Sequence, residues 1–100
     1  MPPEDGIDSL ERDLEALQAA HPDLEPLAGI VLLAVCAQYD PGRGKGVNTA
    51  LLAQRLDIEH ALIRRAVTDL ETRGWITAES AGGASPALRL VPTDERPSLR

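Results

Sequence analysis

Aromatic residues are almost absent from this sequence, which has one tryptophan, one tyrosine and no phenylalanine among 100 residues. Small aliphatic side chains must therefore form its core, and such a core suits closely packed helices. The sequence also has only one cysteine, Cys36, which excludes an internal disulfide and favours a reducing compartment. Because Cys36 lies within a hydrophobic stretch, we expect a buried and unreactive thiol.

Long hydrophobic runs are missing as well. The longest, from Ala28 to Ala37, is too short to cross a bilayer. No basic segment precedes a hydrophobic run near the N-terminus, so the sequence shows no signal peptide. We therefore expect one soluble, cytoplasmic domain without membrane contact.

Positive charge is scarce, since 10 Lys and Arg residues face 16 Asp and Glu residues and give a net charge of −6. This balance argues against a generic nucleic-acid binder. The acidity is uneven, however. Residues 1–25 hold eight acidic residues and one arginine, Arg12, and carry −7, so residues 26–100 carry +1. The near-neutral remainder of the chain permits contact with DNA.

The N-terminal part of the chain predicts a helix after a disordered start. We expect disorder over residues 1–6 and a helix over residues 7–20. Hydrophobic residues recur along this helix at spacings of three and four, which gives a narrow apolar stripe. The stripe consists of Ile7, Leu10, Leu14 and Leu17. It can pack on its own domain or form the dimerisation contact with a second subunit, and the pattern leaves both alternatives open.

A second predicted helix, residues 26–39, is apolar on nearly all sides and should be the buried central helix. The glycine-rich segment 40–46 then has the composition of a loop. It is not a phosphate-binding loop, because its lysine is not followed by Ser or Thr and no strand precedes it. We interpret it as a flexible connector, in which Arg43 and Lys45 are candidate contacts to a DNA phosphate.

Residues 48–73 show the pattern of two short helices joined by a tight turn. Asn48 and Thr49 are good N-cap residue types for the first helix. The second helix has one apolar stripe, formed by Ile63, Ala66, Val67 and Leu70. Gly74 permits the left-handed conformation that ends a helix.

The composition after Gly74 changes to that of a β-hairpin. Residues 75–80 and 87–91 read as two strands, and the intervening segment 81–86 is rich in turn-forming residues. Pro92 ends the hairpin, and we expect a flexible tail over residues 93–100.

Two short helices followed by a hairpin form a winged helix-turn-helix. The segment from Leu52 to Ile76, a quarter of the chain, resembles this unit in MarR-type bacterial transcriptional regulators. The matching residues are Leu52, Ala53, Leu56, Ile58, Ile63, Leu70, Glu71, Arg73, Gly74, Trp75 and Ile76. The resemblance implies a mainly α fold with a small β-hairpin wing (α+β) over residues 7–92. The helix over residues 7–20 is then an extra N-terminal helix.

The resemblance further implies a DNA-binding transcriptional regulator that acts as a homodimer on double-stranded DNA. In the resembled family, the second helix of the motif lies in the major groove. The predicted DNA contacts on this helix are His60, Arg64, Arg65 and Thr68. Arginine is suited to this role because its rigid fork can contact guanine or a phosphate. The predicted set is completed by Thr49, Arg43, Lys45 and Arg89. Of these, Arg89 lies on the returning strand of the wing.

Other features favour a second hypothesis, a winged-helix module that binds protein and does not bind DNA. The N-terminal arm is acidic, and the wing tip, residues 81–86, contains no Arg or Lys. Leu62 occupies a position that is usually polar in the family, and an exposed leucine there would mark a protein-contact surface. Asp57 and Glu59 also depart from the family pattern, which usually has glycine and a small hydroxyl residue there.

An ion-pair ladder is an alternative role for Arg65, because Arg65, Asp69 and Arg73 follow one another at spacings of four. Arg64 has no acidic residue at that spacing and is the freer of the two arginines. The sequence contains no metal-ligand spacing, nucleophile motif or plausible cysteine–histidine pair. We therefore expect no enzyme activity, no metal and no cofactor.

Overall fold

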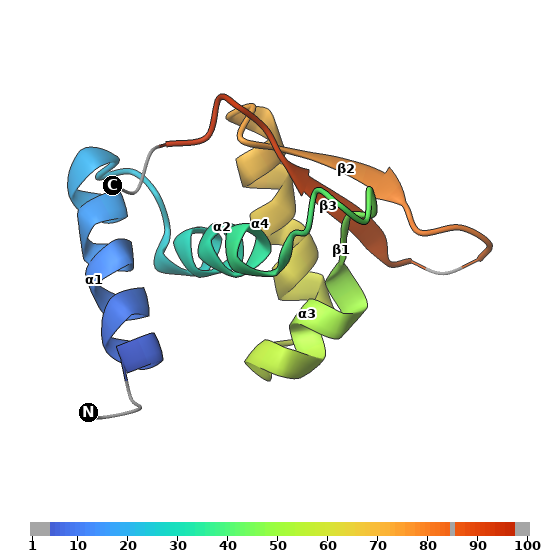
Figure 1. Ribbon diagram of the computed structural model, residues 1–100, viewed down its shortest axis with the longest axis horizontal. Helices are drawn as coiled ribbons and strands as arrows, with labels where there is room; N and C mark the ends of the chain where they lie inside the picture. Colours follow the sequence, from blue (N-terminus) through green and yellow to red (C-terminus); the bar gives the residue numbers. More distant parts are fainter. Residues whose placement is uncertain (1–4, 85, 98–100) are drawn as a thin grey trace.

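The computed structural model describes residues 5–84 and 86–97, with side chains from residue 10 onward. Over this part of the chain there are four helices and a small antiparallel sheet; three of the helices pack against the sheet, and the N-terminal helix packs on the second helix (Figure 1). The elements are α1 (Asp5–Ala20), α2 (Pro26–Gln38), β1 (Val47–Asn48), α3 (Thr49–Leu56), α4 (His60–Thr72), β2 (Ile76–Ser80) and β3 (Leu88–Pro92). The predicted α+β class is confirmed, and the predicted helix and strand bounds differ from the observed ones by at most two residues.

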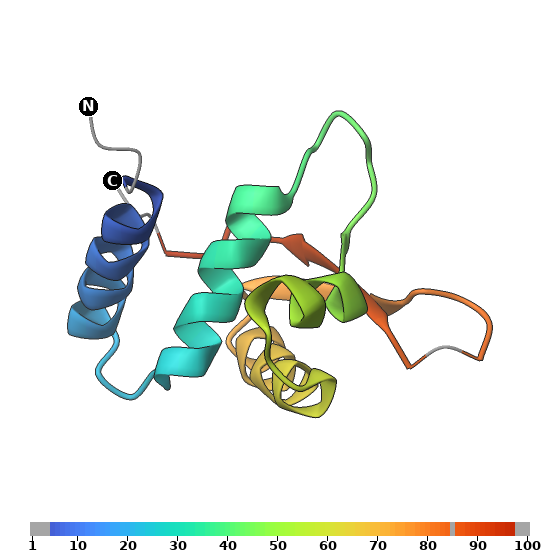
Figure 2. The ribbon, with the colours of Figure 1, turned by 90° about the horizontal axis from the view of Figure 1, so that it is seen from below.

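The central position of α2 follows from its apolar composition. Pro26 occupies its first turn, where a missing N–H has no cost. The helix packs against α1 on one side and α4 on the other (Figures 1 and 2). Val31, Leu32 and Val35 are at most 1% exposed. This confirms that the apolar segment forms the buried central helix.

The apolar stripe of α1 packs on the chain's own domain. Leu17 is 2% exposed and belongs to the core, and Leu14 packs against that core. Leu17 is therefore not available as a dimer contact, and the prediction of that role for it is wrong. Leu10 is 37% exposed and remains accessible. The side chain of Ile7, the fourth predicted contact, lies outside the described residues.

The two helices of the helix-turn-helix begin and end at residues with identifiable roles. Asn48 caps α3, because its Oδ1 accepts hydrogen bonds from the amides of Ala50 (2.7 Å) and Leu51 (3.3 Å). Asp57 ends α3 in the left-handed conformation, with φ of 55°. This explains why the resembled family usually has glycine at the same turn.

The C-terminus of α4 is a Schellman motif centred on Gly74, whose φ is 81°. The Gly74 amide donates to the Glu71 carbonyl (2.9 Å), and the Trp75 amide donates to the Leu70 carbonyl (3.1 Å). The motif ends α4 and leads the chain directly into β2, which confirms the prediction that the helix ends at Gly74.

The sheet has the strand order β1-β3-β2, so the returning strand of the wing lies in the middle. β1 was not predicted, because two residues are too few to show a strand pattern. Cα pairing aligns Val47 and Ala78 with the fully buried Leu90, and this row faces the core. Gly46 approaches the sheet so closely that a Cβ atom there would lie 2.9 Å from the backbone nitrogen and oxygen of Leu90.

The segment after the wing is anchored where it leaves β3, which corrects the predicted start of the tail at residue 93. The Thr93 hydroxyl donates to the Gly74 carbonyl (2.6 Å), and the Thr93 amide donates to the Trp75 carbonyl (2.9 Å). Arg96 lies beside Cys36, whose thiol is half-buried. Burial raises the pKa of this thiol. Residues 98–100 of the predicted tail, and residues 1–4 of the predicted disordered start, lie outside the described residues. Residues 5 and 6, which were also predicted to be disordered, belong to α1.

Among the described helices, none combines the length and the apolar character that a membrane crossing requires.

Candidate nucleic-acid interface

The outer face of α4 presents polar side chains to solvent. Because Ile63, Ala66, Val67 and Leu70 are buried, helical spacing places other residues on the opposite side. This outer face consists of Ala61, Arg65, Thr68 and Thr72, with Arg64 on its flank, and all five residues are exposed. We call these five residues the outer face of α4.

Arg64 and Arg65 make no ion pair within the part of the chain that the structure describes. Their guanidinium groups are therefore available to a ligand. The Thr68 hydroxyl donates to the Arg64 carbonyl (3.1 Å), so its proton is used within the helix. Its methyl group and remaining lone pair are the parts that Thr68 offers to a ligand.

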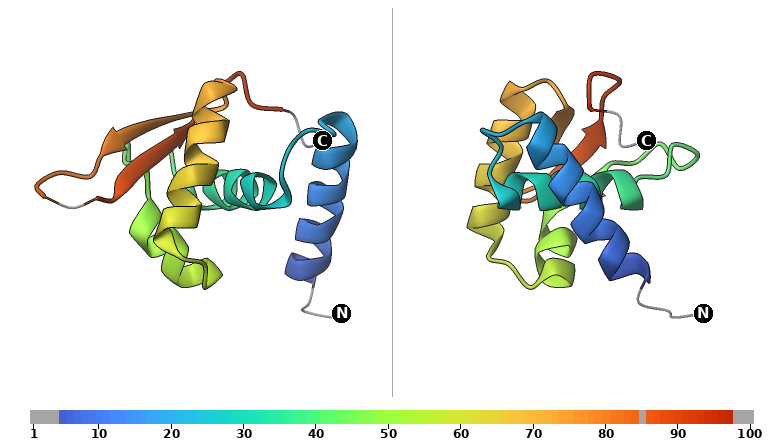
Figure 3. Two further views of the ribbon diagram at one scale, coloured as in Figure 1. Left: turned by 180° about the vertical axis from the view of Figure 1, so that it is seen from behind. Right: turned by 90° about the vertical axis from the view of Figure 1, so that its left-hand side faces the viewer.

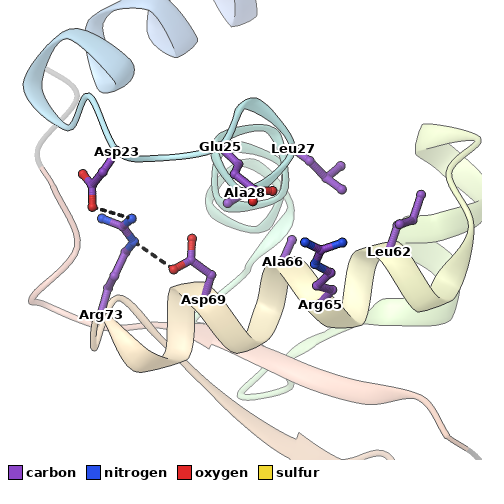
Figure 4. Close-up of a pocket in the computed structure, with 9 residues that line it drawn as sticks. All are labelled: Asp23, Glu25, Leu27, Ala28, Leu62, Arg65, Ala66, Asp69 and Arg73. Atoms are coloured by element: carbon purple, nitrogen blue, oxygen red, sulfur yellow. Dashed lines mark hydrogen bonds and ion pairs between the residues drawn. The ribbon is translucent and has the colours of Figure 1, made fainter.

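The predicted ion-pair ladder along α4 forms only in its second half. Arg73 Nε donates to Asp69 Oδ1 (3.2 Å), as the spacing predicted, but Arg65 does not join this pair. The second partner of Arg73 is Asp23, in the segment between α1 and α2, and the distance from Arg73 Nη2 to Asp23 Oδ2 is 3.1 Å (Figure 4). The ladder therefore does not account for Arg65.

Arg73 is the centre of a cluster that joins the α1–α2 segment to the end of α4. Its guanidinium carbon lies 5.2 Å from the centroid of the Trp75 ring. The His21 ring packs edge-on against the same ring, with 4.7 Å between the two ring centroids. The hydrogen bond from Arg73 lowers the pKa of Asp23. Arg73 is thus a structural cation with its charge already paired.

The start of α4 is tied to α3 and to the wing through a buried hydroxyl. Thr49 is fully buried, and its Oγ1 lies 2.8 Å from His60 Nε2 and accepts the Leu88 amide at 2.8 Å. The prediction that Thr49 contacts DNA is therefore wrong, because the side chain has no exposed surface. His60 is half-buried, and one of its ring nitrogens is occupied by this contact.

Arg43 and Lys45 do not lie with the outer face of α4. They are exposed in the loop after α2, and α3 stands between this loop and α4 (Figures 2 and 3). With Arg55 of α3 they border a groove of about 290 Å³, which Leu51 and Asn48 also line. Arg55 was not among the predicted contacts, although it is exposed; its Nη1 donates to Gln38 Oε1 at 2.8 Å.

Arg89, the predicted cation of the wing, faces an acidic neighbour. Cα pairing places Arg89 opposite Glu79 on β2, so both side chains emerge on the solvent face of the sheet. Lys45, Glu79 and Arg89 together line a shallow depression on this part of the surface. The hairpin projects away from the helices (Figure 1), and its tip, residues 81–86, carries no cation.

A second hollow, of about 310 Å³, lies between the start of α2 and α4 (Figure 4). Acidic side chains and Arg73 line one end of it, and Leu62, Arg65 and Leu27 line the other. Leu62 is 39% exposed. Exposure of this leucine is what the hypothesis of a protein-contact surface requires. Among the described residues, no group of three His, Cys, Asp or Glu side chains is arranged to hold a metal ion.

The arrangement of α3, α4 and the hairpin defines a winged helix-turn-helix domain. No protein-family sequence pattern and no curated protein sequence matches the chain. Among solved structures, the chain is similar to a MarR protein from Peptoclostridium difficile DA00132, with a TM-score of 0.64 and 16% sequence identity. The match covers 91% of this chain and 56% of that chain, so the chain spans little more than half the length of that protein. At this level of identity the likeness concerns the fold, and it confirms the MarR-like winged helix, including the N-terminal helix.

Proposed function

We propose that this chain is a transcriptional regulator that binds double-stranded DNA through the outer face of α4 and acts as a homodimer. One observation carries the proposal. Arg64 and Arg65 are exposed on the second helix of a helix-turn-helix, without ion-pair partners among the described residues. In this fold, the exposed face of that helix is the one that fits the major groove.

The neighbours of the two arginines suit close approach to a duplex. Ala61 precedes them with only a methyl group, so at this position of the first turn of α4 no bulky side chain obstructs a duplex. Thr68 adds a methyl group that can contact thymine. Glu59, immediately before the helix, and Asp69 limit the positive charge, so we expect binding that depends on few phosphate contacts.

The salt dependence of binding tests this proposal. Fluorescence anisotropy with labelled duplex should give a linear fall of log affinity with log salt concentration. Replacing Arg64 and Arg65 by alanine should reduce the magnitude of that slope by about 1.8, the contribution of two phosphate contacts. The matched control replaces Arg43 and Lys45 by alanine, which removes the same charge from the other side of α3 and should leave the slope per bound chain near that of wild type. Equal loss in both variants would show that overall charge, and not the face of α4, determines binding.

A module that binds protein is the second candidate, and the exposed position of Leu62 favours it. Leu62 lies beside Arg65 at the mouth of the hollow between α2 and α4, and a partner side chain can bury it there. If the chain shows no binding to duplex DNA even at low salt, this candidate replaces the first.

A further inference from the structure

The groove beside α3 is the surface that the proposed DNA contact leaves unused. Three cations border it, Arg43 and Lys45 from the loop and Arg55 from α3, against one carboxylate, that of Asp40. Arg43 and Lys45 form no ion pair within the described part of the chain. Leu51, also in the lining, is 51% exposed. The groove therefore combines an apolar side chain with a net positive rim.

The N-terminal helix has the complementary character. Residues 1–25 carry −7, and Glu11 and Glu15 are exposed one turn apart on α1. Leu10, beside Glu11, is 37% exposed. An exposed leucine next to carboxylates on α1 thus corresponds to an exposed leucine next to cations in the groove.

Within one copy of the chain, α1 does not reach this groove. Leu14 and Leu17 hold α1 against α2, at the opposite end of α2 from the loop (Figure 2). The N-terminal turns of α1 extend beyond α2 (Figures 1 and 3), and among the side chains that are described there, Leu10, Glu11 and Glu15 are exposed. A second molecule can approach these turns without disturbing the core.

We propose that the groove formed by Arg43, Lys45, Arg55 and Leu51 binds the acidic N-terminal helix α1 of a second copy of this chain. In a two-fold dimer, each α1 enters the groove of the other copy, so that the contact is made twice. The proposal specifies the contact of the dimer in the proposed function, and it replaces the apolar stripe as that contact. It does not depend on DNA binding, because α4 takes no part in it.

Charge exchange between the two surfaces gives a direct test by sedimentation velocity in the absence of DNA. The groove variant R43E/K45E and the helix variant E11K/E15K should each be monomeric, because like charges then face each other. An equimolar mixture of the two variants should form a dimer, since both groove–helix pairs regain opposite charges. Wild type should dimerise at low salt, with a dissociation constant about tenfold or more below that of either variant.

The control variant R64E/R65E makes the same change of charge on α4 and should dimerise as wild type does. A wild type that stays monomeric at low salt would overturn the proposal, as would a mixture of the two variants that stays monomeric. Self-association that R43E/K45E does not weaken would place the dimer contact elsewhere. Binding of inorganic phosphate at residues 43–46 without any change in mass would make the groove a small-anion site and would also overturn it. A monomer that still binds DNA through α4 would contradict only the dimer contact.

Discussion

Thr49 Oγ1 lies 2.8 Å from His60 Nε2, across eleven positions of the sequence, and the same oxygen accepts the Leu88 amide at 2.8 Å. This fully buried hydroxyl joins the first residue of α3, the first residue of α4 and the first residue of β3. The tautomer of the His60 ring determines whether the hydroxyl donates to Nε2 or accepts from it, while its oxygen accepts the Leu88 amide in either case. One side chain therefore links the starts of α3, α4 and β3.

Replacing Thr49 by valine should lower the free energy of unfolding by about 2–4 kcal/mol, because the Leu88 amide and the His60 ring each lose a partner while the volume is kept. Replacing it by serine keeps the hydroxyl and should cost only about 1 kcal/mol, the contribution of one methyl group. Urea denaturation of the two variants measures the difference. If the serine variant were as unstable as the valine variant, Thr49 would stabilise the fold through the packing of its methyl group and not through its hydroxyl.

The Asp23–Arg73 pair predicts a pH dependence of stability. Because the folded-state pKa of Asp23 lies below its ordinary value of 3.8, the pair stabilises the folded chain above that value. Its contribution is lost as the pH falls through the folded pKa. The difference in free energy of unfolding between wild type and Asp23→Asn should therefore be present at pH 7, begin to decrease near pH 3.8, and disappear once the pH is below the folded-state pKa. A difference that persists unchanged in acid would rule out a contribution from charge.

Two glycines should respond differently to alanine. At Gly46 the new Cβ would meet the backbone of Leu90 at 2.9 Å, and a sheet backbone cannot move aside, so we expect a loss of about 1–3 kcal/mol. At Gly29 the new Cβ would lie too close only to the end of a flexible side chain, Leu14 Cδ1 at 2.6 Å, while Leu17 and Leu24 would be at ordinary contact distances of 3.5 and 3.6 Å. The gain in helix propensity, about 1 kcal/mol, offsets that contact, so thermal unfolding should show the smaller change for Gly29→Ala.

Features determined by local sequence could be predicted. Asn48 caps α3, Gly74 ends α4, and the apolar spacing of α4 identifies its buried face, because each depends on residues within one or two turns. The apolar composition of residues 26–39 likewise identified the central helix. The winged-helix fold followed from the order of these elements.

Features determined by distant contacts could not be predicted. Thr49 has the residue type of a surface cap, but it is buried and accepts the amide of Leu88, 39 positions away. Asp23 and Arg73 are 50 positions apart, so the sequence offered only Asp69 as a partner for Arg73. The arrangement of α3 between the loop and α4 separates Arg43 and Lys45 from Arg64 and Arg65, and nothing in their spacing indicates this.

The most direct test of the account is an NMR titration of the ¹⁵N-labelled chain with duplex DNA at low salt. We predict that the amide signals of residues 61–68 shift most strongly, and that those of residues 40–46 serve as an unperturbed internal control. Shifts confined to residues 40–46, with the signals of α4 unchanged, would contradict the assignment of the DNA contact to Arg64 and Arg65.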